Sequence, residues 1–126
     1  MRPDSALLAL RPAIPTAPAE AEAPDSAGAF LHATLRPVLK LQNALLLAVV
    51  ADFVADHHIP LANAEATQRQ RLLTELLGRN LKLRYIIVGL ISGQFTAAEY
   101  AFYQRNRNEL NRRILDLATQ RVLSQL

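Results

Sequence analysis

Six polar side chains, in two parts of the chain, have the types and spacing that would suit binding of a small anion. Arg36, Lys40 and Asn43 lie three or four residues apart, so they share one face of a helix. Guanidinium, ammonium and amide groups are donors that an anion can use. We predict a polar pocket if the two groups of residues converge. Its members would be Arg36, Lys40, Asn43, Tyr103, Asn106 and Arg107.

The same residues also have a structural interpretation. Arg36 can extend its charged end into water while its stem covers apolar surface. Arg107 can pair with Glu99, or with Asp52 or Asp56 across a helical bundle. Pairing is the simpler role, and the pocket is the sharper hypothesis, because convergence depends on how the helices pack.

A metal site or a catalytic centre has less support. Asp52, Asp56, His57 and His58 are metal-ligand types, but zinc needs three or four converging ligands and this spacing matches no such pattern. The chain has no cysteine, which excludes thiolate ligands and disulfides. It also has no glycine-rich phosphate loop. We therefore predict no catalytic residues, no metal and no cofactor, and we favour a non-enzymatic protein, with a small-ligand or enzymatic site at the polar pocket left open.

The uneven distribution of charge raises nucleic acid as an alternative partner. The net charge is +3, and residues 65–126 hold ten basic and five acidic side chains. Within this half, Glu109 and Asp116 follow Arg105 and Arg112 by four residues, the spacing of ion pairs on a solvated helix. Carboxylates among the arginines oppose binding to phosphates, so nucleic acid remains the alternative. The arginines concerned are Arg105, Arg107, Arg112, Arg113 and Arg121.

The elements that would position these residues are helices. Five of the seven prolines fall in residues 1–28, which predicts a disordered Pro/Ala-rich tail before a bundle domain over residues 29–126. We expect three long helices, over about 37–57, 64–92 and from 97 almost to the C-terminus. Thr96 and Glu99 have the spacing of a capping box, and Gly93 has the place of a left-handed residue that ends a helix. The second and third helices would form an antiparallel hairpin, with Asn80 setting helix register.

The predicted helices carry more apolar surface than three helices can easily bury. Residues 44–54 are apolar nearly all round, apart from Asp52, and residues 77–91 leave only a narrow polar strip. A helix of this kind is expected to be buried on most sides. We predict a homodimer through the first two helices, with a groove for a partner helix or an apolar ligand as the alternative. The predicted interface residues are Leu46, Val50, Val54, Leu77, Leu81, Tyr85, Ile87 and Val88.

Two stretches, residues 34–43 and residues 93–100, resemble those of small bacterial all-α proteins of unknown function. The resemblance covers about residues 30–126 and implies an all-α fold. We expect no signal peptide, because the N-terminus lacks the apolar run of one, and no membrane span, because we expect no stretch to reach the ~20 apolar residues that a span needs. We therefore expect a cytoplasmic, non-enzymatic interaction or regulatory protein that does not bind membranes.

Overall fold

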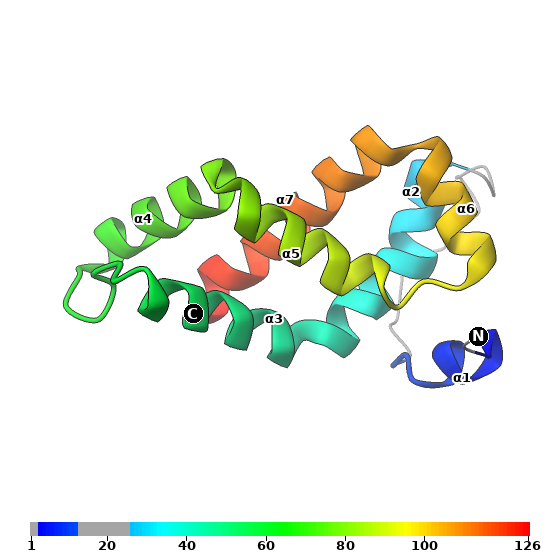
Figure 1. Ribbon diagram of the computed structural model, residues 1–126, viewed down its shortest axis with the longest axis horizontal. Helices are drawn as coiled ribbons and strands as arrows, with labels where there is room; N and C mark the ends of the chain where they lie inside the picture. The colour runs from blue at the N-terminus through cyan, green and yellow to red at the C-terminus, as the bar shows by residue number, and fades with distance from the viewer. Residues whose placement is uncertain (1–2, 13–25) are drawn as a thin grey trace.

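The computed structural model describes residues 3–12 and 26–126 of the chain, and all the regular structure in those ranges is helical (Figure 1). This confirms the predicted all-α class. Each of the three predicted long helices is present: the first, over about 37–57, is undivided and extends further towards the N-terminus, whereas the second and third are each divided by a local irregularity. The elements are α1 (Asp4–Ala9), α2 (Ala27–Phe30), η2 (Leu31–Leu35), α3 (Arg36–Asp56), α4 (Ala66–Arg79), α5 (Leu81–Ser92), α6 (Ala97–Arg105) and α7 (Arg107–Gln125).

The first long helix contains a π-helical turn, η2, between α2 and α3. Ser26 caps its start, because the Ser26 hydroxyl oxygen accepts a hydrogen bond from the Ala29 N–H at 3.0 Å. The Arg36 N–H donates to the Leu31 carbonyl, five residues back, and Pro37 follows in the first turn of α3. Proline has no N–H, so the ordinary α-helical ladder cannot continue through this position. The wider turn of η2 accommodates this gap.

The second long helix is broken at Asn80, which separates α4 from α5. Asn80 has an extended backbone (φ −79°, ψ 105°), and its side-chain oxygen accepts from the Leu83 N–H at 3.0 Å. Asn80 is therefore the N-cap of α5, and the prediction that it sets register from within one helix is wrong. Arg84 donates to the Leu77 carbonyl at 2.8 Å, which satisfies a carbonyl that the break leaves without a helical partner.

The third long helix is preceded by a tight turn and divided at Asn106 (φ −129°, ψ 32°). The predicted capping box is confirmed. The Glu99 N–H donates to the Thr96 hydroxyl, and the Thr96 N–H donates to the Glu99 carboxylate at 2.8 Å. Gly93 is right-handed (φ −62°), so the predicted left-handed conformation is wrong. A Cβ at Gly93 would lie 2.9 Å from the Gly89 carbonyl oxygen, so close backbone approach is what favours glycine there.

The core lies where α3, α5 and α7 contact one another, and α4 packs against α7 (Figure 1). Apolar side chains from all of these helices fill it, among them Leu110 and Ile114 of α7. Five residues predicted to form a dimer interface are buried within the single chain, and this corrects the prediction for them. They are Leu46, Val50, Val54, Leu77 and Ile87.

The predicted disordered tail is not uniform. Asp4–Ala9 forms helix α1, and Leu7 of this helix is buried against the bundle. The Asp4 carboxylate accepts from the Ala97 N–H at the start of α6, at 3.4 Å. The prediction is therefore corrected for this segment, because apolar and charged contacts with the bundle hold it in place. Residues 1–2 and 13–25, which include three of the five prolines of the predicted tail, lie outside the described residues.

The helical stretch from Ala27 to Asp56 is long and apolar enough to cross a membrane by length and composition, and it is the one such stretch in the described residues. The prediction that no stretch reaches this length and apolarity is therefore corrected. The structure joins α2, η2 and α3 into one continuous stretch of 30 residues. Core helices can have the same composition, and 33% of the apolar window is buried within the fold.

Candidate functional site

The structure divides the predicted polar pocket between two places. Arg36 and Lys40, at the start of α3, line a pocket whose other wall is the C-terminal part of α7, and Asn43 contacts that same part of α7. The other three predicted residues lie where α6 joins α7. They are Tyr103, Asn106 and Arg107, and none of them lines this pocket.

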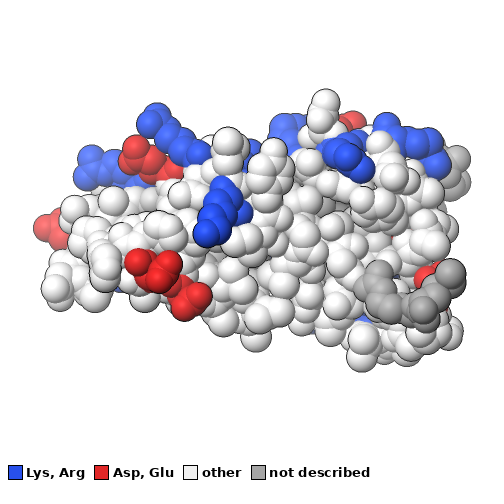
Figure 2. All heavy atoms as spheres, viewed as in Figure 1, with Lys and Arg blue, Asp and Glu red and all other residues white. Residues whose placement is uncertain are grey.

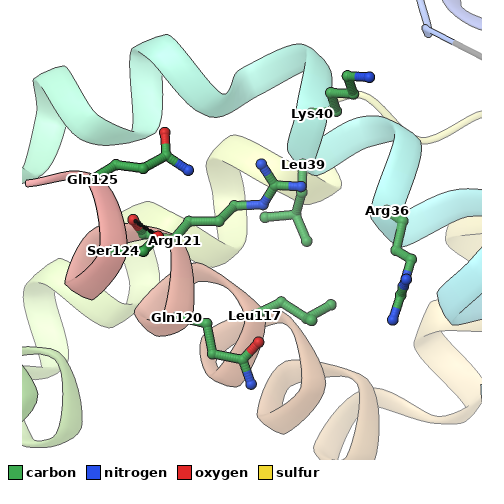
Figure 3. A pocket seen from close by; sticks show the side chains of 8 residues that line it. All are labelled: Arg36, Leu39, Lys40, Leu117, Gln120, Arg121, Ser124 and Gln125. Carbon is green, nitrogen blue, oxygen red and sulfur yellow. Dashed lines mark hydrogen bonds between the residues drawn. The ribbon is translucent and has the colours of Figure 1, made fainter. Parts of the chain in front are cut away.

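The pocket between α3 and α7, here called the α3–α7 pocket, has a volume of about 410 Å³. This is within the usual range of ligand sites. Figure 3 shows Arg121 extending from α7 across the gap towards α3, with Leu39 beneath it and the Lys40 side chain turned away from Arg121. The lining residues are Arg36, Leu39, Lys40, Leu117, Gln120, Arg121, Ser124 and Gln125.

Asn43 holds the two sides of the pocket together. Its side-chain oxygen accepts a hydrogen bond from the Arg121 guanidinium at 3.1 Å, and its amide nitrogen donates to the Gln125 side-chain oxygen at 2.8 Å. Arg121 is thus a pocket residue that the predicted set lacked. Its place beside the apolar stripe of the third helix was the available signal, because a charged side chain there must emerge at the edge of the core.

The electrostatics of the α3–α7 pocket are one-sided. Three of its lining residues are cationic, and none is acidic. Burial lowers the pKa of Arg121, and the nearby positive charge of Arg36 lowers it further. Both effects disfavour the charged form of the guanidinium, which nevertheless stays protonated. The pocket therefore concentrates positive charge without a carboxylate to balance it.

The polar residues at the α6–α7 junction are used in packing. The Tyr103 hydroxyl donates to the Asn111 side-chain oxygen, and the Arg107 guanidinium lies over the Tyr103 ring, 5.5 Å from its centroid. The Asn106 side chain donates to the Phe102 carbonyl at 3.0 Å. Burial raises the pKa of Tyr103 despite the opposing effects of Arg107 and Asn111. These contacts stabilise the bend, and they replace the predicted ion pairs of Arg107.

A second arginine cluster, which sequence reasoning missed, joins the N-terminal segment to α6. Arg11 donates to both carboxylate oxygens of Glu99, at 2.7 Å each, and to the Gln94 carbonyl at 2.8 Å. The Thr34 hydroxyl donates to Glu99 at 3.0 Å. Burial alone would raise the pKa of Glu99, but the hydrogen bonds from Arg11, Thr96 and Thr34 and the Arg11 charge outweigh it and hold that pKa below its ordinary value.

The candidate metal ligands show no converging arrangement. Across residues 3–12 and 26–126, no group of three or more histidine, cysteine, aspartate or glutamate side chains is placed to hold a metal ion. The His57 ring stacks on the Phe53 ring with centroids 3.9 Å apart, and its Nδ1 lies 3.0 Å from the Phe53 carbonyl oxygen. His57 therefore packs against its own helix end.

The arginines considered for nucleic-acid binding are mixed with carboxylates and aromatic rings. Arg112 pairs with Asp116 as predicted, at 3.7 Å, whereas Glu109 pairs with Arg113 at 3.3 Å. Arg105, the predicted partner of Glu109, instead lies over the Phe102 ring, 5.7 Å from its centroid. No uniformly basic stripe of these side chains follows α7, so the helix lacks the charge pattern typical of a phosphate-tracking surface.

A mostly apolar surface remains exposed where α3 and α5 lie side by side. Tyr85 is 73% exposed and Leu81 is 66% exposed, so these two of the predicted interface residues are at the surface, and Val88 is half-buried. Figure 2 shows few charged side chains over α3 and α5 on this side, while Lys and Arg gather along the upper edge. The α3–α5 face consists of Ala44, Leu45, Ala48, Ala51, Ala55, Leu81, Tyr85 and Ile86.

Comparison with known proteins provides no template for either surface. No protein-family model matches the chain, and no curated protein and no solved structure matches it. The function is therefore inferred from the geometry of the α3–α5 face and of the α3–α7 pocket.

Proposed function

We propose that this chain is a non-enzymatic interaction protein that assembles as a homodimer through the α3–α5 face. The observation that carries the proposal is the exposure of Leu45 on α3 and of Leu81, Tyr85 and Ile86 on α5, two helices that contact each other. Contiguous exposed apolar surface of this kind is uncommon on monomers and typical of association surfaces. Tyrosine is also enriched at the centres of protein interfaces.

Charge complementarity supports a second copy of the chain as the occupant. Lys82 and Asp52 are exposed at the same end of the face, where α5 begins and α3 approaches its end (Figure 1). Neither has an ion pair or side-chain hydrogen bond to the described part of the chain. In a two-fold dimer each surface meets its own copy. A two-fold axis between these residues would bring Lys82 of one protomer near Asp52 of the other.

The small residues of α3 support close packing of the two copies. Ala44, Ala48, Ala51 and Ala55 recur at intervals of three or four residues, so they form one exposed stripe along the helix. Short side chains allow a partner helix to approach closely. The larger Leu45 of α3 and Ile86 of α5 are also exposed, and the two helices are joined where Gln42 donates to the Leu90 carbonyl at 3.0 Å.

The first experiment measures the mass of the full chain by size-exclusion chromatography with light scattering. We expect a dimer, and we expect the double variant Leu81→Asp, Tyr85→Asp to be monomeric, because dimerisation would bury two unpaired charges. Leu81 is the first residue of α5, where a carboxylate is favourable for the helix. Loss of the dimer with an unchanged circular dichroism spectrum would therefore identify an interface effect.

The matched control is Leu8→Asp, because Leu8 is an exposed leucine on α1 and lies outside the α3–α5 face. It should remain dimeric. Lys82→Glu should weaken the dimer, and Lys82→Glu combined with Asp52→Lys should restore it. A monomeric wild-type chain at high concentration, or a dimer that survives the double variant, would contradict the proposal. A monomer would direct attention to a different helical protein as the occupant.

A further inference from the structure

The α3–α7 pocket contains charge that the proposed dimer does not use. Arg36 and Lys40 make no hydrogen bond or ion pair with the described part of the chain. Arg121 has one side-chain hydrogen bond, to the neutral Asn43. A guanidinium has five N–H donors, so most donors of Arg121 remain available to a ligand. Arg36 and Lys40 are exposed and Arg121 is half-buried, and like charges brought together without a counter-charge favour binding of an anion.

We propose that the α3–α7 pocket binds the phosphate group of a small phosphorylated ligand. The structure brings together three cations from two helices, without an acidic lining residue, in a concave site of about 410 Å³. A phosphate monoester carries nearly two negative charges at neutral pH. It can therefore balance most of the charge of Arg36, Lys40 and Arg121. This inference goes beyond the proposed dimerisation and does not depend on it.

The donor types favour phosphate over a single carboxylate. A guanidinium presents a planar fork that matches two oxygens of a phosphate group, and Arg36 and Arg121 offer two such forks from opposite walls. Lys40 adds a point charge. The Gln120 and Gln125 amides can donate to further oxygens. A carboxylate has only two oxygens and one charge, so it would leave donors and charge unmatched.

Asn43 acts as a positioning residue for Arg121. It accepts a hydrogen bond from the Arg121 guanidinium and anchors itself through Gln125. This arrangement limits the conformations of a long side chain before the ligand arrives. Pre-ordering of that kind improves affinity because less side-chain entropy is lost on binding. The neutral amide can hold Arg121 without cancelling its charge, which a carboxylate at the same position would do.

The test is isothermal titration calorimetry of the full chain with inorganic phosphate and with pyrophosphate, in a low-salt chloride buffer. We expect saturable binding of one anion per chain, with Arg36→Gln and Arg121→Gln each weakening it at least about tenfold. The matched control is Arg71→Gln. Arg71 is an exposed arginine of α4, so this substitution removes the same charge outside the pocket. The proposal is overturned if neither phosphate nor pyrophosphate binds, or if all three variants lose the same amount of affinity.

Asn43→Asp tests whether the uncompensated charge of the pocket drives phosphate binding. The aspartate keeps the acceptor for Arg121 but supplies the missing negative charge, so we expect a higher melting temperature together with loss of phosphate binding. If Asn43→Asp instead binds phosphate as well as the wild type does, the electrostatic argument is wrong.

Two further arms identify the source of the phosphate. Flotation with vesicles of phosphatidylcholine containing phosphatidic acid, compared with phosphatidylcholine alone, tests a lipid headgroup. Phosphate binding with vesicle binding would support a lipid source, and phosphate binding without it would support a free metabolite. A duplex oligonucleotide tests nucleic acid. Binding of the duplex without saturable binding of phosphate or pyrophosphate would overturn the proposal in favour of nucleic acid.

Discussion

Arg11 and Arg121 are both part-buried arginines that reach from one helical segment to another, but their surroundings differ. Arg11, whose side chain is 6% exposed, is matched by the carboxylate of Glu99, which is 17% exposed. Arg121 has only the amide of Asn43 as its side-chain partner. A matched charge closes a contact and stabilises the fold. An unmatched guanidinium keeps N–H donors that can bind a ligand. The comparison predicts that substitutions in the two clusters will have very different effects.

The largest effect is expected for Glu99→Gln. This change leaves the buried guanidinium of Arg11 without its counter-charge and removes part of the capping box of α6. We expect the free energy of unfolding to fall by about 2–3 kcal/mol. Urea denaturation followed by circular dichroism would measure it. Glu109→Gln is the control, since its pair with Arg113 is more exposed, and it should cost less than about 0.5 kcal/mol. Equal losses would show that burial does not distinguish the two pairs.

The pH dependence of stability is the next effect in size. The pKa of Glu99 is lowered in the folded chain, so its ionised form contributes stability that is complete above the pKa of the unfolded chain. This contribution is lost as the pH falls through the lowered folded pKa. The stability difference between the wild type and Glu99→Gln should therefore shrink below about pH 4. Urea titrations at several pH values would measure it. A constant difference down to acidic pH would contradict the role of the Glu99 charge.

The smallest effect is expected for Arg121→Gln in the absence of a ligand. Glutamine can still donate a hydrogen bond, and the change removes the repulsion between Arg121 and Arg36. We expect the free energy of unfolding to change by less than about 0.5 kcal/mol. The same urea assay, in phosphate-free buffer at low salt, provides the measurement. A loss comparable to that of Glu99→Gln would mean that Arg121 stabilises the fold and would remove the contrast between the two clusters.

Part of the candidate site followed from local spacing. Arg36, Lys40 and Asn43 could be placed on one helix face, because helical periodicity depends only on neighbouring residues. Their partner Arg121 is 78 residues from Asn43, and its role depends on how α7 crosses α3. The predicted pocket also included Tyr103, whose place relative to α3 no local pattern could fix. The bend at Asn106 and the packing of the ring place it elsewhere.

The apolar helices show a second limit of sequence reasoning. Leu46 and Ile87 are in the core, whereas Leu81 and Tyr85 are exposed, although all four lie in strongly apolar stretches. A helix that is apolar all round has no polar side to show which face turns inward. Periodicity could therefore predict a surplus of apolar surface, but it could not say which residues form that surplus.

The sequence by itself determined the helical class, the three long helical stretches and the capping box of Thr96 and Glu99. These features depend on propensities, periodicity and hydrogen bonds between residues a few positions apart. Only the tertiary structure decided that Arg11 meets Glu99, 88 residues away, and that Arg121 lies opposite Arg36 without a carboxylate. Contacts between distant residues depend on helix crossings and on competition among many side chains. No local pattern encodes that competition.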